Sequence, residues 1–310
     1  MAEMLYARDV YGKTLVELGK AHPNLVVLDA DLSGSTRTQL FAREFPERFF
    51  NFGVAEQNMM ATAAGLASCG KIVFASTFAM FATGRAWDQV RNSICYNQFN
   101  VKIVASHAGL TVGPDGASHQ ALEDICLMRA IPNMTVIVPC DGPETRQAII
   151  AAYEHNGPVY VRLGRTKVPT IEGKAEFVLG KGYKLKEGQD VSLVACGIMV
   201  KHCLDAAAVL EKTGVSARVI NLHTLRPIDK EIILAAAKET KGIIACEEHS
   251  VVGGLAGAVS EIVLENQPVP VLKVGVKNRF GQSGEPDELL QEYCLTCEEI
   301  VKTANKLLRR

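Results

Sequence analysis

Apolar and polar positions alternate along this chain in two rhythms. Short apolar runs at 25–28, 49–52, 72–76, 101–105, 135–138 and 159–163 have the length and composition of buried strands. Between them, stretches such as 8–20, 81–94 and 143–153 have the spacing of amphipathic helices. Strands that alternate with helices indicate a parallel sheet with crossover connections, so the chain is predicted to be an α/β protein.

A break in this pattern divides the chain. Residues 169–190 contain one proline and four glycines mixed with charged residues, which is typical of a connection between domains. Alternation then restarts, with predicted strands at 191–195, 217–221, 242–246 and 271–274 and helices near 199–213, 229–239, 254–266 and 298–308. We therefore predict two doubly wound α/β domains, at 1–168 and 191–310, joined by a linker at 169–190.

Composition and charge narrow the class of partner. The 310 residues carry a formal net charge of -1, and 48% of them are hydrophobic, which suits two soluble domains. No long basic run is present, no apolar stretch has transmembrane length, and no leader pattern follows Met1. We expect neither a nucleic acid nor a membrane as partner. Nine cysteines without a secretion signal favour reduced thiols and a cytoplasmic location.

Polar or aromatic side chains come where strands of the first half end. In an open α/β sheet the carboxyl ends of parallel strands face the ligand crevice, so these residues are expected to meet along one edge. The pattern predicts a site without naming its ligand. The residues concerned are Asp29, Asp31, Glu56, Thr77, Phe78, His107, Asp141 and Arg165.

Glu56 is the most informative of these residues. It stands at the start of a predicted helix, among small and apolar residues. A carboxylic acid there either caps the helix and faces water, or lies in an apolar pocket with a raised pKa. The small residues at 61–67 fill little space, so another group must lie against this helix. That requirement favours the pocket.

The segment 106–124 is a long loop that holds two histidines, His107 and His119, together with Asp115. Long loops inside compact domains are usually functional or disordered, and we expect this one to be ordered because it follows a buried strand and opens a helix at Ser118. Histidine moves protons near neutral pH, so the loop predicts proton chemistry. The aromatic residues at 77–81 are either core packing or a surface on which a flat ring stacks.

Several common signatures do not occur in the sequence. It has no GxxxxGK[ST] phosphate loop, no GxSxG elbow and no HExxH, and residues 252–257 lack the first glycine of a dinucleotide fingerprint. The CxxC at 294–297 has no second pair and no nearby histidine. No metal site is therefore predicted in this chain.

Four segments together resemble the C-terminal half of a transketolase: FGVAEQNM at 52–59, TFAMF at 77–81, the 106–124 loop, and ADLSGS at 30–35. The match covers the whole chain, as a pyrimidine-binding domain followed by a transketolase C-terminal domain. The resemblance implies thiamine diphosphate as cofactor. Glu56 then matches the acid that hydrogen-bonds N1′ of the aminopyrimidine and activates the cofactor. Phe81 matches the residue that stacks on this ring, with Phe78 beside it, and Asp31 lines the cofactor pocket.

The resemblance also implies substrate contacts. His107, Asp115 and His119 match positions that contact the sugar hydroxyls and carbonyl, and both histidines would share the catalytic role with Glu56. Arg8, Ser35 and Arg165 match positions that bind the phosphate of a sugar phosphate, which a planar arginine fork suits. One departure is Gly84, where some members carry another aromatic residue. It puts in doubt how tightly the pyrimidine ring is held.

A larger departure concerns the diphosphate end of the cofactor. The family binds diphosphate and Mg²⁺ through a Gly-Asp-Gly segment followed by an asparagine in an N-terminal domain, and this sequence contains neither. The resemblance therefore implies one subunit of a split transketolase, active only with an N-terminal partner subunit that holds Mg²⁺, in an α2β2 heterotetramer. Pentose phosphate metabolism is the default pathway, and the preferred sugar phosphates are left open.

Three alternatives stay open. Deoxyxylulose-phosphate synthase shares GVAEQ and the loop but typically has arginine at the position of His107. The beta subunit of 2-oxoacid dehydrogenases has the same two-domain plan and a different loop. A non-catalytic binding or assembly protein on this fold is disfavoured because Glu56, both histidines and Arg165 are present. The second domain is expected to serve packing and dimer contacts, although His249 at a strand end is placed to approach a site.

Overall fold

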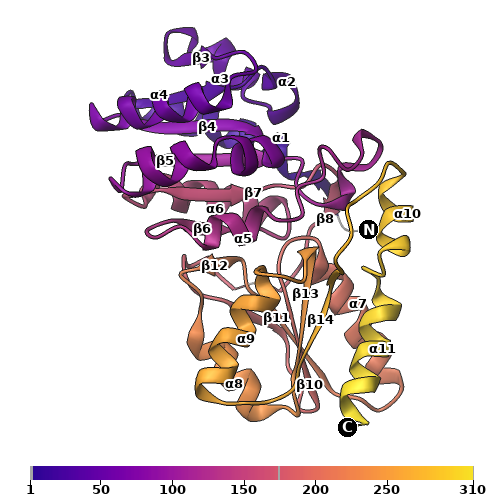
Figure 1. Cartoon of the computed structure of the whole chain (residues 1–310). Coiled ribbons are helices and arrows are strands. Elements are labelled where there is room, and N and C mark those ends of the chain that lie inside the picture. The colour runs from indigo at the N-terminus through magenta and orange to yellow at the C-terminus, as the bar shows by residue number, and fades with distance from the viewer. Residues whose placement is uncertain (1–2, 174, 310) are drawn as a thin grey trace.

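Seven strands form the sheet of the first domain, in the order β12-β6-β7-β5-β4-β2-β3. The computed structural model describes residues 3–173 and 175–309, and Figure 1 shows its two sheets one above the other. The six predicted strands of this half are present, with ends that differ by at most two residues, and they run parallel. Their bounds are β2 (Leu25–Asp29), β3 (Phe49–Asn51), β4 (Ile72–Phe78), β5 (Val101–Ser106), β6 (Thr135–Ile137) and β7 (Val159–Arg162).

Helices cover both faces of this sheet, because its strands are apolar on both sides. Successive residues of a strand point to opposite faces, and Val27 accordingly joins one core cluster while Leu28 joins another. α1 (Ala7–Ala21) and α6 (Gly142–Glu154) pack on the first face, and α4 (Glu56–Ser68) on the second. The remaining short helices are α2 (Ser33–Thr36), α3 (Gln39–Glu44), η1 (Pro46–Arg48) and α5 (Asp124–Arg129).

Two helical predictions differ from the structure. The predicted helix at 81–94 is wound mostly as π-helix, in η2 (Phe81–Arg85) and η3 (Gln89–Cys95), and such wider turns are frequent at functional sites. The helix predicted to open at Ser118 begins only at Asp124, so that prediction was wrong. Asp124 is fixed by the side chains of Tyr160 and Arg162 from β7, and the loop therefore continues up to it. Within the loop, η4 (Leu110–Asp115) is a short 3₁₀ segment.

The second domain has a five-stranded sheet in the order β14-β13-β10-β11-β9. The four predicted strands are present as β10 (Val191–Ala195), β11 (Ala217–Asn221), β13 (Ile243–Ser250) and β14 (Val271–Val276). β9 (Tyr183–Lys186) lies inside the stretch predicted as a linker and pairs antiparallel with β11. In Figure 1, α8 (Lys230–Glu239) and α9 (Leu255–Asn266) lie on one side of this sheet, and α7 (Met199–Lys212) and α11 (Cys297–Leu308) on the other. α10 (Pro286–Glu292) packs against η4 of the first domain.

Segments far apart in the sequence join the two domains. β12 (Thr224–Arg226) comes from the second half of the chain but pairs antiparallel with β6 at the edge of the first sheet. β1 (Met4–Tyr6) pairs with β8 (Lys167–Pro169), which brings the two ends of the first domain together. These pairings leave the site loop of the first domain in contact with the second.

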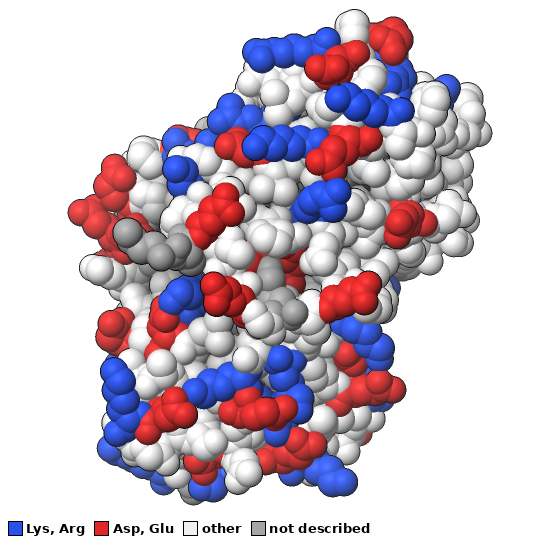
Figure 2. Space-filling view, turned by 180° about the vertical axis from the view of Figure 1, so that it is seen from behind, with Lys and Arg blue, Asp and Glu red and all other residues white. Residues whose placement is uncertain are grey.

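The surface and the thiols agree with the composition. Figure 2 shows Lys and Arg interspersed with Asp and Glu on the face turned to the viewer, with no large area of one sign. Among the described residues, no disulfide joins any of the nine cysteines. Among the residues that the structure describes, no helix is long and apolar enough to span a membrane.

Candidate functional site at the carboxyl edge of the first sheet

The ends of five neighbouring strands form the candidate site. β3, β2, β4, β5 and β7 are consecutive in the sheet and parallel, so the segments that follow them lie along one edge. Glu56 follows β3, Phe81 follows β4, His107 follows β5 and Arg165 follows β7. The sheet thus brings together residues separated by more than a hundred positions in the sequence.

Glu56 is the first residue of α4, and only 1% of its side chain is exposed. Of the two fates considered for this acid, burial is the one observed. Its carboxylate is paired: Nη1 of Arg85 donates to Oε1 at 2.8 Å and to Oε2 at 2.9 Å. Arg85 remains 47% exposed and closes the carboxylate from the solvent side. A buried carboxylate held in this way accepts N–H donors at both of its oxygens.

An aromatic cluster lies beside this carboxylate. Phe78 and Phe81 are stacked with ring centres 6.2 Å apart, and the guanidinium carbon of Arg85 lies 4.6 Å from the centre of the Phe81 ring. His107 stacks on the other ring, with 3.9 Å between the centres of His107 and Phe78. His119 meets the Phe81 ring edge-on at 5.3 Å. Both loop histidines therefore reach the aromatic pair, and Phe78 contacts both a phenyl ring and an imidazole ring.

His107 is a neutral imidazole in this setting. It is buried, and burial together with the positive charges of Arg8 and Arg165 lowers its pKa to about 3. The hydroxyl Oγ of Ser106 lies 2.9 Å from its Nδ1. A ring that stays neutral across physiological pH offers a hydrogen bond but holds no proton to give. The other histidine of the loop, His119, is only half-buried.

Two of the three predicted phosphate-binding residues, Arg8 and Arg165, line one cavity. Arg8 and Arg165 border a pocket of about 400 Å³ that also includes Lys167, and residues of the second domain complete its wall. Arg8 Nη1 donates to the backbone oxygen of Ser35 at 3.4 Å, which places Ser35 beside the same group. Arg165 lies 3.6 Å from the carboxylate of Asp115 and donates to the backbone oxygen of Val112. The complete lining is Tyr6, Arg8, Thr111, Pro114, Arg165, Thr166, Lys167, Glu285 and Pro286.

The two aspartates after β2 have different environments. Asp31 is exposed and pairs with Asn51, whose Nδ2 donates to the Asp31 carboxylate at 3.2 Å. Asp29 is buried and accepts hydrogen bonds from the hydroxyls of Thr36 and Thr38 at 2.7 and 2.8 Å. Burial raises the pKa of Asp29, and these hydroxyl groups oppose the shift. Asp29 therefore shapes the turn, while Asp31 faces outward at the rim of the site.

Asp141 was expected to lie with the other polar residues at the carboxyl edge of the sheet. Its carboxylate instead accepts hydrogen bonds from backbone N–H groups. It follows β6, on the far side of β7 from the other strand ends. Its carboxylate caps α6 by accepting the backbone N–H of Glu144 at 2.9 Å, and it also accepts that of Ile171 at 2.8 Å. These bonds are the ordinary work of an N-cap residue.

The second domain holds the site loop in place. The buried carboxylate of Glu248 accepts the backbone N–H of Thr111 at 2.7 Å. Nε2 of Gln120 donates to the backbone oxygens of Leu110 and of Gln282, at 3.2 and 2.9 Å. The Ser283 hydroxyl donates to the backbone oxygen of Pro114 at 2.7 Å. With the bond from the backbone N–H of Ser250 to the backbone oxygen of Leu122 at 2.8 Å, the loop that carries His107 and His119 is tied at four points to the C-terminal half of the chain.

Family profiles match both domains. The transketolase pyrimidine-binding domain matches residues 3–170, and the transketolase C-terminal domain matches residues 180–300. A transketolase C-terminal section from Methanocaldococcus jannaschii is 53% identical over 299 residues, which are 95% of this chain and 94% of that protein. This chain belongs to the transketolase family. Its length and its two domains correspond to the C-terminal half of the family's full-length members.

Two further relatives are informative. A 6-deoxy-6-sulfo-D-fructose transketolase subunit from Clostridium sp. is 42% identical over 306 residues, which are 98% of this chain and 95% of that protein. A solved structure described as a split gene transketolase, inactive β4 tetramer, superimposes with a TM-score of 0.92 at 53% identity. It covers 98% of this chain and 99% of that one. The name of the Clostridium protein gives a sulfo sugar as its substrate.

Two residues of the candidate site, Arg85 and Glu248, were not predicted from the sequence. Arg85 lies four positions after Phe81, a spacing that places both side chains on one helix face, but the sequence does not show that the arginine turns to Glu56. Glu248 lies in the second domain, which was expected to serve packing and dimer contacts. His249 is indeed buried: its Nδ1 lies 2.7 Å from the backbone oxygen of Ser250, and its Nε2 accepts the N–H of Cys126 at 3.4 Å. It bonds to backbone and lines none of the site cavity.

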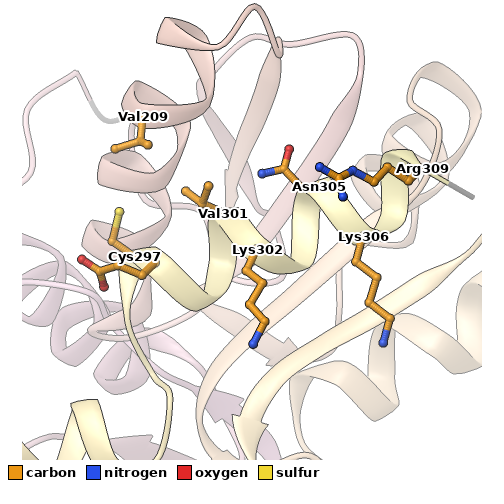
Figure 3. Close-up of a pocket in the computed structure, with 8 residues that line it drawn as sticks. Val209, Cys297, Val301, Lys302, Asn305, Lys306 and Arg309 are labelled. Carbon is orange, nitrogen blue, oxygen red and sulfur yellow. The ribbon is translucent and has the colours of Figure 1, made fainter.

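A second concavity lies away from this site. It is a groove of about 860 Å³ between α7 and α11, and Figure 3 shows Lys302 and Lys306 extending from α11 on the side away from Val209. It shares no residue with the sheet edge. Its lining is Val209, Cys297, Glu298, Val301, Lys302, Asn305, Lys306 and Arg309. Within residues 3–173 and 175–309, no three His, Cys, Asp or Glu side chains cluster so as to hold a metal ion.

Gly109 is expected to be intolerant of a side chain. Its φ is +87°, and a Cβ there would lie 2.3 Å from the carboxyl carbon of Glu248. Gly109→Ala should lower the free energy of unfolding by about 2–4 kcal/mol, from backbone strain and from the clash together. Gly214→Ala is the matched control, because Gly214 has φ +80° with nothing within 4 Å. Equal losses in the two variants, measured by urea unfolding, would contradict the close contact with Glu248.

The depressed pKa of His107 predicts a pH effect on stability. The folded chain keeps His107 neutral down to about pH 3, whereas the unfolded chain takes up this proton near pH 6.5. The unfolded state binds more protons between these values, so stability is lost as the pH falls through 6.5. By pH 5 the loss should be about 1–2 kcal/mol. His107→Gln should remove that part of the change between pH 7 and pH 5; an unaltered pH dependence would show that His107 is not held neutral.

Proposed function

We propose that this chain is the C-terminal subunit of a split transketolase. Together with an N-terminal subunit, it transfers a two-carbon ketol unit from a ketose phosphate to an aldose phosphate. The observation that carries the proposal is the buried carboxylate of Glu56 beside the face of Phe81, in a chain that matches the family over both domains. We place the domain boundaries at 168 and 191.

The site fits the pyrimidine half of thiamine diphosphate. The carboxylate of Glu56 and the ring of Phe81 already accept one flat group that carries N–H donors, the guanidinium of Arg85. Glu56 would hold N1′ of the aminopyrimidine, Phe81 would stack on its ring beside Phe78, and Asp31 would line the rim. When bound, thiamine diphosphate supplies the nucleophilic carbon that carries the ketol unit, while the protein orients and polarises it.

The loop histidines are proposed to act on the sugar. His107, held neutral, would hydrogen-bond a hydroxyl or carbonyl group of the substrate. His119, half-buried at the edge of the Phe81 ring, would exchange the proton that moves as the carbon–carbon bond breaks or forms. Asp115 lies in the same loop, and its carboxylate would accept a hydrogen bond from a hydroxyl group of the sugar. All three lie on the segment that the second domain ties down.

The pocket between Arg8 and Arg165 is proposed to bind the anionic end of the sugar. Two guanidinium groups and the exposed amine of Lys167 give it a positive lining, and Glu285 is the acidic residue among the lining side chains. Planar guanidinium groups fit the oxygens of a phosphate. Ser35, beside Arg8, would add a hydroxyl donor. The same lining suits other tetrahedral oxyanions, so the pocket alone does not select the pathway, and pentose phosphate metabolism is the default.

The partner completes the cofactor site in this proposal. The diphosphate and Mg²⁺ would be held by the N-terminal subunit, because the sequence has no Gly-Asp-Gly segment with its asparagine. We propose an α2β2 heterotetramer in the cytoplasm, where free thiols such as those of this chain persist. The similarity to a split gene transketolase chain supports the partner.

Reconstitution tests this function directly. The N-terminal subunit is sought in the neighbouring coding sequence, recognised by its Gly-Asp-Gly and asparagine pattern. The two purified chains are mixed with thiamine diphosphate and Mg²⁺, and ketol transfer between a ketose phosphate and an aldose phosphate is measured. We expect activity from the mixture and none from either chain alone. Activity of this chain alone would refute the split site.

The same reconstitution separates the alternatives. Release of carbon dioxide from pyruvate would indicate a synthase of the deoxyxylulose-phosphate type or a 2-oxoacid dehydrogenase. Chains that associate but bind no thiamine diphosphate would indicate a non-catalytic assembly protein. Ketol transfer without carbon dioxide release supports the transketolase.

A further inference from the structure

Arg85 occupies the place proposed for the aminopyrimidine ring. One of its nitrogens donates to both oxygens of Glu56, at 2.8 and 2.9 Å, and its guanidinium lies over the face of Phe81 at 4.6 Å. These are the same two partners, the same carboxylate edge and the same aromatic ring. The rest of Glu56 is enclosed, so this edge is the one that a ligand can approach.

The guanidinium group resembles the aminopyrimidine in its chemistry. Both are flat and delocalised, and both present nitrogen along one edge. Each pairs with a carboxylate in its own molecular plane, and each stacks on a phenyl ring. Two such groups cannot occupy one edge of Glu56 at the same time. Binding of the ring therefore requires the side chain of Arg85 to leave.

The local structure allows this side chain to move while its backbone stays fixed. The side chain is 47% exposed, and its hydrogen bonds go to the carboxylate of Glu56. The backbone oxygen of Arg85 accepts Nε2 of Gln57 at 3.1 Å, which ties the end of η2 to α4. Gly84 beside it has only the methyl group of Met80 near its Cβ position, at 3.9 Å, so the site has room on that side.

We propose that Arg85 is an internal place-holder for the aminopyrimidine. It neutralises and orients Glu56 in the single chain, and it is displaced from the carboxylate when thiamine diphosphate binds with the partner subunit. This inference rests on the proposed function and adds a residue to it. The ion pair has a double consequence: it stabilises the single chain, and its loss is part of the free energy of cofactor binding.

One variant, Arg85→Ala, should therefore lower the stability of the single chain and at the same time strengthen cofactor binding. Arg85→Ala leaves Glu56 buried without its partner, so the melting temperature of the single chain at pH 7 should fall by about 2–4 °C. In the reconstituted complex the same variant has no side chain to displace. Thiamine diphosphate, titrated calorimetrically with Mg²⁺ present, should bind about fivefold tighter, as expected for one half-exposed ion pair that no longer opposes binding.

Two further variants test the interpretation of this result. Arg85→Lys keeps the charge but not the flat shape, so its dissociation constant should lie between those of the wild type and Arg85→Ala. Arg91→Ala is the control in the next helical segment, η3; Arg91 is exposed and pairs with Asn92, so neither melting nor cofactor binding should change. If the Arg85→Ala complex is too unstable for titration, the dissociation constant of Arg85→Lys is compared with that of the wild type. Tighter binding by Arg85→Lys supports the proposal, and equal or weaker binding overturns it.

The outcomes distinguish this proposal from the function on which it rests. If the wild-type complex binds no thiamine diphosphate, the proposed function fails and the place-holder role fails with it. If the wild type binds and Arg85→Ala binds equally or more weakly, only the place-holder role is overturned, because Arg85 is then structural or holds the cofactor itself. A lower melting temperature of the single chain combined with tighter binding supports the proposal.

Discussion

Replacing Glu56 by alanine is expected to lower kcat of the reconstituted enzyme by about 10²–10⁴-fold, the range for losing one acid–base group. The carboxylate is the buried acid at the ring end of the proposed site, and among the described residues no second acid pairs with Arg85, whose guanidinium lies over Phe81. Alanine leaves the aromatic stack in place but removes the group that polarises the pyrimidine. The measurement is steady-state ketol transfer at saturating cofactor.

Two controls make this result interpretable. Glu56→Gln keeps the size of the side chain, and we expect a loss of activity nearly as large because the amide cannot share a proton as a carboxylate does. Glu47→Ala removes an exposed glutamate that pairs with Arg48 outside the site, and it should leave kcat unchanged. Turnover within threefold of wild type in Glu56→Ala, with the subunits still associated, would contradict the role of Glu56.

The strands and the site edge were predictable because each depends on a local pattern. Buried parallel strands need apolar residues on both faces, and runs such as 25–28 and 101–105 show this directly. Once the strands are parallel, the residues that follow them must share an edge, which places Glu56, Phe81 and His107 together without any knowledge of contacts. Residue type and position were sufficient for this part of the site.

The remaining features depend on contacts between distant segments. The pairing of Glu56 with Arg85 spans 29 positions, and the bond from Glu248 to the backbone of Thr111 spans 137. Neither has a periodic signature, and Gly109 reads as an ordinary loop glycine until the carboxylate of Glu248 is found against it. The π-helical winding of 81–95 likewise leaves the apolar pattern of a helix unchanged.

Edge strands were missed for a related reason. β9 has exposed and half-buried positions and glycines nearby, so it resembles a linker more than a strand. It is held by its pairing with β11, and β12 is held by its pairing with β6 of the other domain. An antiparallel edge strand needs no run of apolar residues, since one neighbour and one covered face suffice.

A buried ion pair joins the site loop to both domains. The carboxylate of Asp124 accepts Nε of Arg162 at 2.7 Å and the hydroxyl of Tyr160 at 2.7 Å. Both ionic side chains are at most 5% exposed. Nη2 of Arg162 also donates to the backbone oxygen of Glu248 at 2.9 Å, and so reaches the second domain. Burial alone lowers the pKa of Arg162, but the charges of Asp124 and Glu248 raise it overall, so the guanidinium stays protonated.

Asp124→Ala should therefore cost far more than the loss of a surface ion pair. It leaves the buried Arg162 cation hydrogen-bonded to the backbone oxygens of Ala121 and Glu248, and breaking a buried pair from one side typically costs about 3–5 kcal/mol. Urea unfolding at one fixed protein concentration measures the loss, since association changes apparent stability.

Glu261→Ala is the matched control: it breaks a pair with Arg129 in which the acid is 63% exposed, and a loss of about 0–1 kcal/mol is expected. Asp124→Asn, which keeps the shape, should also lose more than the control. Equal losses for Asp124→Ala and Glu261→Ala would show that Arg162 finds water or a new partner, and that the pair does not hold the loop against the second domain.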